Sequence, residues 1–219
     1  NTTLYARWAA NPYTVEYWNK AGTTKLSSDA NFKYDTARNL ASEPSSGIST
    51  GYSAVGWATA KGQTEKTYEF GSSQKNLATS GTKTLYLAET PNKYTVSFNI
   101  NGGKDEANSK PADATATFDS ALPAINANKP KKDGYTFKGW YDTSAATGGT
   151  MYYDASNKAV SGKTWDKAKN TTLYARWAAS PYAIAFDTQG GPEVPSISAT
   201  YDQDVTLPAP GARNGYRFL

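Results

Sequence analysis

Three segments of the sequence alternate between apolar and polar residues in the way that a half-buried β-strand does. They begin at Tyr13 (YTVEYWNKAG), Tyr94 (YTVSFNINGG) and Tyr182 (YAIAFDTQGG). In the second segment, Val96 and Phe98 share a face with the opening tyrosine, whereas the residues between them are polar. Because side chains alternate between two faces along a strand, this pattern predicts one buried and one solvated face. The Asn-Gly-Gly that ends the second segment is typical of a turn with positive φ angles.

Other landmarks recur together with these opening strands. The ten residues NTTLYARWAA occur at 1–10 and again, unchanged, at 170–179, and a weaker copy, TKTLYLA, lies at 82–88. Between the opening and closing segments come an aromatic–Asp pair and a Gly-Tyr segment, in that order. The pairs are Tyr34-Asp35, Phe118-Asp119 and Tyr201-Asp202, and the Gly-Tyr segments begin at Gly51, Gly134 and Gly215. Such ordered recurrence indicates an array of repeats of about 80–90 residues, the size of a small domain.

The landmarks divide the chain into four expected parts. Residues 1–10 would be the closing strand of a preceding repeat, and residues 11–90 a divergent repeat. Residues 91–179 would be a well-matched repeat, and residues 180–219 the truncated first half of a further repeat. The chain begins in the middle of the pattern, so we expect it to be a piece of a longer protein.

Most of the large aromatic residues at the landmarks are expected to lie in the cores, because so small a module has few other large apolar groups. These structural landmarks are Trp57, Trp140, Trp165, Trp177, Tyr135 and Phe137. Gly139, directly before Trp140, suggests a β-bulge. Residues 163–169 (KTWDKAK) predict one short helical turn that carries Trp165 inward. Each repeat would therefore be a small α+β or mostly β module, and we expect the α+β class, rich in β-strands.

Composition excludes several kinds of chemistry. The chain has no His and no Cys, so it offers no imidazole base, no thiol nucleophile, no disulfide and no His- or Cys-bound metal. Its net charge of +4 is a mild excess, and the densest basic stretch, around Lys131, is typical of a solvated loop. We therefore expect no nucleic-acid partner. No apolar run approaches the roughly 20 residues of a membrane span, so we expect no membrane insertion within this segment.

Paired carboxylates are the remaining route to an enzyme. An Asp that follows a strand aromatic usually caps a turn, and here the pair recurs in every copy, whereas an active site is expected once. No Asp-x-Asp-x-Asp-Gly spacing of a calcium loop occurs. We therefore expect no catalytic residue, no metal and no cofactor.

Trp18 is the best candidate for a binding residue. In its strand Tyr13, Val15 and Tyr17 are predicted to face inward, so Glu16 and Trp18 face outward. An outward Trp beside a Glu is a candidate contact for a partner or a glycan. Packing of Trp18 on a neighbouring module or loop is an equally good interpretation.

The landmarks resemble the Listeria–Bacteroides repeat family, which includes the B-repeat of internalins. The family pattern is an opening Y-x-V-x-F-x-x-x-G-G, a central G-Y-x-F-x-G-W and a closing T-L-Y-A-x-W, which residues 94–103, 134–140 and 172–177 carry. The resemblance implies β-grasp-like modules, arranged as beads in series, in a bacterial surface protein. The first repeat departs from the pattern at Ala54 and at its closing Trp position, which holds Ala88 or Glu89.

Three functions are compatible with these observations. We expect a non-enzymatic extracellular stalk, spacer or adhesion module at the bacterial cell surface, either secreted or attached to the cell wall. The alternatives are a module that binds a glycan or a protein of a host or neighbouring cell through exposed aromatics, with specificity in the divergent repeat, and an accessory segment of a larger secreted enzyme. Because residues 1–10 would be a strand without its own module, head-to-tail self-association is a further expectation.

Overall fold

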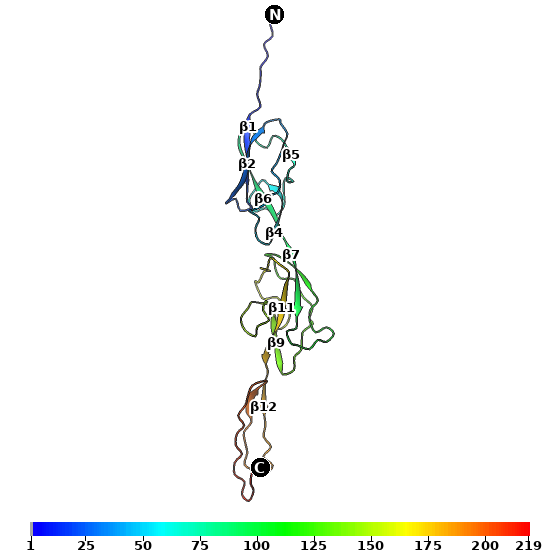
Figure 1. The fold of residues 1–219 in the computed structure, drawn as a ribbon, viewed down its shortest axis with the longest axis vertical. Helices are drawn as coiled ribbons and strands as arrows, with labels where there is room; N and C mark the ends of the chain where they lie inside the picture. The colour runs from blue at the N-terminus through cyan, green and yellow to red at the C-terminus, as the bar shows by residue number, and fades with distance from the viewer. Residues whose placement is uncertain (1) are drawn as a thin grey trace. The chain divides into compact units, whose positions relative to one another are not determined.

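The computed structural model describes residues 2–219, and it divides the chain into two compact units. The first unit comprises Asn1–Tyr94, Thr117–Ser120 and Thr164–Lys169, and the second comprises Thr95–Ala116, Ala121–Lys163 and Asn170–Leu219. Every regular element that the structure describes is a β-strand (Figure 1). The expected α+β class is therefore wrong: the repeats are all-β, and they lack the helix that a β-grasp arrangement would contain. No helix among the described residues has the length and hydrophobicity that crossing a bilayer requires.

A four-stranded sheet forms the first unit, in the order β2-β1-β6-β4. Its strands are β1 (Pro12–Trp18), β2 (Lys25–Lys33), β4 (Tyr52–Ala58) and β6 (Gly81–Pro91), and the short strands β3 (Arg38–Asn39) and β5 (Ser73–Gln74) pair with each other. β1 runs parallel to β6 and antiparallel to β2, and β4 runs antiparallel to β6. The apolar face of β1, with Val15 and Tyr17, packs on Phe32, Trp57 and Leu85. Alternation thus placed the buried face of this strand correctly.

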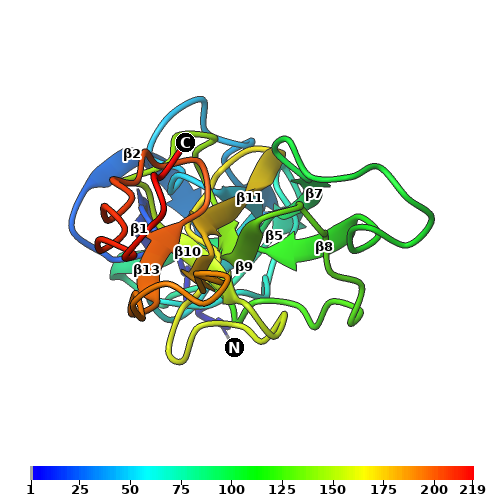
Figure 2. The ribbon, with the colours of Figure 1, turned by 90° about the horizontal axis from the view of Figure 1, so that it is seen from below.

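A second, five-stranded sheet repeats the same central arrangement, in the order β10-β9-β11-β7-β8 (Figure 2). Its strands are β7 (Lys93–Asn99), β8 (Ala114–Thr117), β9 (Tyr135–Tyr141), β10 (Met151–Asp154) and β11 (Thr171–Ala179). β7 is parallel to β11, as β1 is to β6, and β9 is antiparallel to β11, as β4 is to β6. Val96 and Phe98 are buried, as their alternation predicts.

Beyond β11, the second unit contains only one further pair of strands. β12 (Pro181–Ile184) and β13 (Ile197–Thr200) are antiparallel, with Tyr182 opposite Ala199. The structure assigns no strand to residues 201–219.

The expected helical turn at residues 163–169 is absent from the structure. Trp165 is fully buried, as expected, but its backbone is paired with another segment of the first unit. Its N–H donates to the carbonyl of Ser120 at 2.9 Å, and its carbonyl accepts the N–H of Asp119 at 2.8 Å. The backbone groups that a helical turn would use are therefore engaged across the fold.

Identical sequences adopt different structures at residues 2–10 and 171–179. The second copy is β11, which lies between β9 and β7 and buries Leu173 and Ala175. The first copy forms no strand, and its Leu4 and Trp8 are 91% and 92% exposed. Asn1, with which the expected strand begins, lies outside the described residues. The conformation of this sequence thus depends on the strands beside it rather than on its own propensity.

Glycines place a β-bulge in the equivalent strands β4 and β9, as expected for Gly139. The register of β9 shifts opposite Arg176 and Trp177, and that of β4 shifts next to Gly56. A Cβ at Gly139 would lie 2.4 Å from the carbonyl oxygen of Tyr153, and its φ is +127°. Only glycine allows this backbone angle and this close approach together.

Candidate functional site

Trp18 and Glu16 lie on the half-exposed face of β1 and contact each other. The indole Nε1 of Trp18 donates to Glu16 Oε2 at 3.1 Å, and Lys25 Nζ lies 3.1 Å from Glu16 Oε1. The hydrogen bond from Lys25, followed by the one from Trp18, lowers the pKa of Glu16. Trp18 thus presents part of an aromatic ring beside a fixed carboxylate and an ammonium group, a combination suited to stacking on an apolar face and accepting hydroxyl hydrogen bonds.

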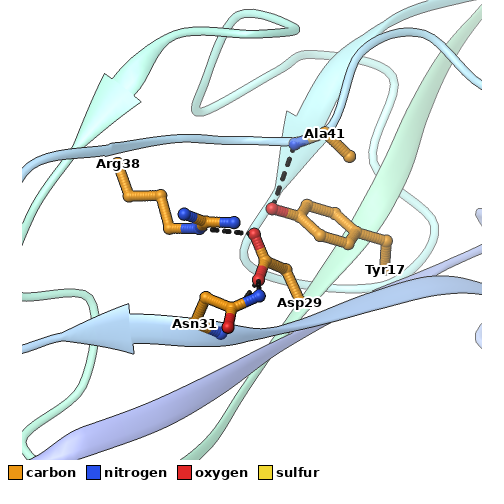
Figure 3. Close-up of polar contacts among 5 residues, drawn as sticks. All are labelled: Tyr17, Asp29, Asn31, Arg38 and Ala41. Atoms are coloured by element: carbon orange, nitrogen blue, oxygen red, sulfur yellow. Dashed lines mark hydrogen bonds and ion pairs between the residues drawn. The ribbon is translucent and has the colours of Figure 1, made fainter.

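A polar network on the neighbouring strand β2 was not found from the sequence (Figure 3). Arg38 Nε donates to Asp29 Oδ2 at 2.6 Å, and Asn31 donates through its backbone and side-chain N–H groups to Oδ1 at 2.9 and 3.0 Å. Burial alone would raise the pKa of Asp29, but the hydrogen bonds from Arg38 and Asn31 outweigh it, so the pKa is lowered. Nearby, the hydroxyl of Tyr17 accepts the N–H of Ala41 at 3.1 Å, and burial raises the pKa of Tyr17. Arg38 thus joins β3 to β2, and Tyr17 joins β1 to the segment after β3, so these contacts are structural.

The aromatic landmarks are used in packing. Trp57, Trp140 and Trp165 are at most 1% exposed, whereas Trp177, Tyr135 and Phe137 are half-buried. Trp57 Nε1 donates to the carbonyl of Ala41 at 2.8 Å, and Trp140 Nε1 donates to Asn157 Oδ1 at 2.9 Å. The ring of Phe137 meets the rings of Trp140 and Trp177 edge-on, at 5.2 and 5.7 Å between centroids.

The Gly-Tyr segment of one repeat contacts the aromatic–Asp pair of the next. Within the first unit, the Tyr52 hydroxyl donates to Asp119 Oδ2 at 3.2 Å, and its ring meets Phe118 edge-on at 5.7 Å. We call this set, Gly51-Tyr52 with Phe118-Asp119, the first clasp. Burial, followed by the hydrogen bond to Asp119, raises the pKa of Tyr52.

A second clasp, Gly134-Tyr135 with Tyr201-Asp202, repeats this geometry within the second unit. The Tyr135 hydroxyl donates to Asp202 Oδ2 at 2.7 Å, and the two tyrosine rings meet edge-on at 5.5 Å. Here the hydrogen bond to Asp202 is the main cause of the raised pKa of Tyr135, and burial adds to it.

One linker residue serves both sides of each clasp. The N–H of Asn92 donates to the carbonyl of Gly51 at 2.9 Å, while its own carbonyl accepts the N–H of Phe118 at 2.8 Å. In the second clasp Ser180 does the same with Gly134 and Tyr201, at 2.8 and 3.0 Å. The same backbone pattern thus joins the two halves of each clasp.

Sequence reasoning identified the turn at each aromatic–Asp pair but not its partner. Asp35, Asp119 and Asp202 all have positive φ, at 59°, 58° and 59°, in keeping with a turn. The contact between the Gly-Tyr segment and the aromatic–Asp pair could have been suspected from one feature of the sequence. Both motifs recur together in every copy.

The described residues offer little to hold a small ligand. No group of three or more Asp or Glu side chains in residues 2–219 is placed to hold a metal ion. A shallow hollow of about 260 Å³ is lined by Ala9, Ala10, Asn11, Tyr34 and Thr79, beside the first aromatic–Asp pair.

The fold and the repeated clasp define a tandem array of small all-β repeats. The chain belongs to the Listeria–Bacteroides repeat domain family, whose pattern matches residues 13–86, 94–176 and 182–219. The family resemblance read from the landmarks is thereby confirmed.

Proteins from two bacteria are similar in sequence to this chain. A predicted membrane protein of Evansella cellulosilytica is 31% identical over 218 residues, which is 99% of this chain and 29% of the relative. A predicted glycine-rich membrane protein of the same organism is 30% identical over 223 residues, which is 100% of this chain and 22% of the relative. Internalin H of Listeria monocytogenes is 36% identical over 141 residues, which is 64% of this chain and 22% of the relative. The chain therefore spans less than a third of the length of each of these relatives.

Proposed function

We propose that the chain is a non-enzymatic repeat region of a bacterial surface protein, which acts as a spacer that presents another part of that protein. The proposal rests on how the recurrent side chains are used. The landmark aromatics pack in the cores, and the recurrent Asp–Tyr pairs join repeats. Repeats of this kind add length with each copy because each buries its own core. The relatives, two predicted membrane proteins and an internalin, support a place at the cell surface.

The spacer role is tested by changing the number of repeats in the parent protein. Surface accessibility of a tag at the distal end is measured with an antibody on intact cells, in proteins with residues 11–179 deleted, present once or duplicated. Accessibility should rise with each copy. Equal accessibility in all three strains would contradict the spacer role, and loss of a hydrolytic activity on deletion would favour the accessory segment of an enzyme.

A second candidate function, binding of a glycan or a surface protein, is favoured by Trp18 alone. Its ring is partly exposed, and the hydrogen bond to Glu16 fixes its orientation, which lowers the entropy lost on binding. Trp18→Ala should abolish binding on a glycan array or to host-cell surface proteins. Tyr182→Ala is the matched control, because Tyr182 is an exposed aromatic of another β-strand. Equal binding by both variants and the wild type would exclude Trp18 as the contact.

A further inference from the structure

The two clasps share the same set of contacts, although they join different pairs of repeats. Each has a tyrosine hydroxyl on an aspartate, two aromatic rings edge-on and a linker residue bonded to both sides. The linker side chain is also engaged: Ser53 Oγ donates to Asn92 Oδ1 at 2.6 Å, and Thr136 Oγ1 lies 2.9 Å from Ser180 Oγ. A chance contact would not be reproduced at this level of detail.

The glycine of each clasp is required by the ring that covers it. A Cβ at Gly51 would lie 2.5 Å from the ring of Phe118, and a Cβ at Gly134 would lie 2.3 Å from the ring of Tyr201. Both distances are shorter than the roughly 3.0 Å to which a Cβ approaches other heavy atoms, so a larger residue would push the ring away. The Gly-Tyr segment is therefore a donor surface shaped for one aromatic–Asp turn.

The first repeat carries the same turn, and among residues 2–219 no tyrosine hydroxyl is bonded to its aspartate. Tyr34 donates its N–H to the carbonyl of Asn11 at 3.0 Å, as Phe118 does to Asn92 and Tyr201 to Ser180. The φ of Asp35 matches those of the clasp aspartates, and its Oδ1 accepts the side-chain N–H of Asn76 at 2.9 Å. The 260 Å³ hollow lies beside Asn11 and Tyr34.

We propose that the Tyr34–Asp35 turn is an open docking surface whose partner is the Gly-Tyr segment of another repeat of this family, bound as in the two clasps. In this chain the exposed donor is Gly215-Tyr216, whose tyrosine is 68% exposed, so a second copy is a competent partner. The inference rests on the array function proposed above and names the contact that joins its repeats.

The first experiment tests the clasp in the whole chain with glycine variants of matched backbone strain. Gly51 and Gly62 share a φ of +82°, but a Cβ at Gly62 would meet nothing within 4 Å. Gly51→Ala should therefore speed amide exchange at Asn92 and Phe118 by about tenfold through loss of the cross-clasp hydrogen bonds. Gly62→Ala should leave both rates unchanged. Equal rates in the two variants would overturn the clasp.

A second pair of variants keeps the experiment decisive if Gly51→Ala does not fold. Asp119→Gly retains the positive φ and removes the acceptor of Tyr52, whereas Asp35→Gly retains the positive φ of the first repeat's turn and removes the acceptor of Asn76. The titration midpoint of Tyr52, followed by NMR, should fall in the first variant only. An unchanged midpoint in Asp119→Gly would contradict the contact.

The open surface is tested by titrating isotope-labelled chain with an unlabelled second copy up to millimolar concentration. Saturable shift changes are expected at Asn11, Tyr34 and Asp35, and both Asp35→Gly in the labelled chain and Tyr216→Ala in the unlabelled chain should abolish them. Absence of shifts, or their persistence in both variants, would overturn the proposal. Loss on Leu4→Asp alone would instead assign self-association to strand addition by residues 2–10. None of these outcomes depends on whether the parent protein uses the array as a spacer.

Discussion

Tyr153 makes the stability of the second repeat sensitive to alkaline pH. Its side chain is fully buried in β10, with its ring against Phe98 and its hydroxyl donating to the carbonyl of Pro123 at 2.9 Å. Burial raises the pKa of Tyr153 to about 12, from the ordinary value of 10.0. The perturbation that isolates this group is Tyr153→Phe, which removes the hydroxyl and keeps the ring.

The size and sign of the effect follow from the two pKa values. Because the folded state binds the phenol proton more tightly than the unfolded state, the stabilisation is fully present below pH 10 and is lost as the pH rises toward 12. Each unit of difference between the folded and unfolded pKa values corresponds to about 1.4 kcal/mol of unfolding free energy. The complete loss of this stabilisation is therefore about 2.7 kcal/mol, and about half of it has occurred by pH 11.

The assay is urea unfolding of the wild type and Tyr153→Phe at intervals from pH 8 to pH 11, because other tyrosines and lysines titrate equally in both proteins and cancel in the difference. At pH 8 the variant should be less stable by about 1–2 kcal/mol, because the Pro123 carbonyl loses its donor. The difference in unfolding free energy between the wild type and Tyr153→Phe should shrink by about 1.4 kcal/mol by pH 11. A gap that stays constant across this range would refute the reasoning.

Three further substitutions test other contacts. Asn157→Gly keeps the positive φ but removes the acceptor of a buried indole and the donor to two carbonyls, so urea unfolding should show a loss of about 2–3 kcal/mol. Arg38→Ala should lower the free energy of unfolding by about 1 kcal/mol at pH 7. The loss should be smaller as the pH falls below about 4, because the ion pair no longer stabilises the fold once the Asp29 carboxylate, whose pKa is lowered, is protonated. Gly139→Ala should lower the melting temperature far more than Gly148→Ala, since a Cβ at position 148 meets nothing within 4 Å; equal losses would exclude the steric explanation.

The sequence predicted the strands better than the class of fold. Alternation along β1 and β7 identified their buried faces, because one face of each strand must cover a core. The helix was wrongly predicted because Trp165 was correctly expected to turn inward, and a helical turn was the local way to achieve this. The structure instead buries Trp165 from an extended segment paired with Asp119 and Ser120, a long-range contact that no local pattern encodes.

The candidate site was only partly visible in the sequence, for a related reason. Trp18 and Glu16 could be placed on one face because they share a strand. Asp29 and Arg38 come from different strands, and their pairing requires the sheet to exist first. The clasp aspartates were recognised as turn residues from their local chemistry, whereas their tyrosine partners lie 67 residues away along the chain.

The first clasp keeps its geometry although the residues around it differ from those around the second clasp. Where the second repeat has Trp177, the first has Glu89, which is fully buried and accepts the N–H of Ser49 at 3.0 Å through Oε1. Ser49 in turn accepts the N–H of Tyr52, so the carboxylate supports the turn that leads into the clasp tyrosine. A lysine also covers each clasp tyrosine, Lys20 over Tyr52 at 4.4 Å and a lysine from a different segment, Lys132, over Tyr135 at 4.1 Å.

Different residues therefore contact and support the Gly-Tyr donor surface in the two repeats. The lysine over Tyr52 follows β1, whereas the one over Tyr135 precedes β9 in the chain, so the two cannot be copies of one ancestral contact kept in place. One packing position differs between the repeats, with the buried Glu89 where the second repeat has the half-buried Trp177, while in both the clasp tyrosine keeps an aspartate partner. Because each clasp joins one repeat to the next, we expect variants of the donor Gly-Tyr to disturb the array more than a change at the position of Glu89 and Trp177.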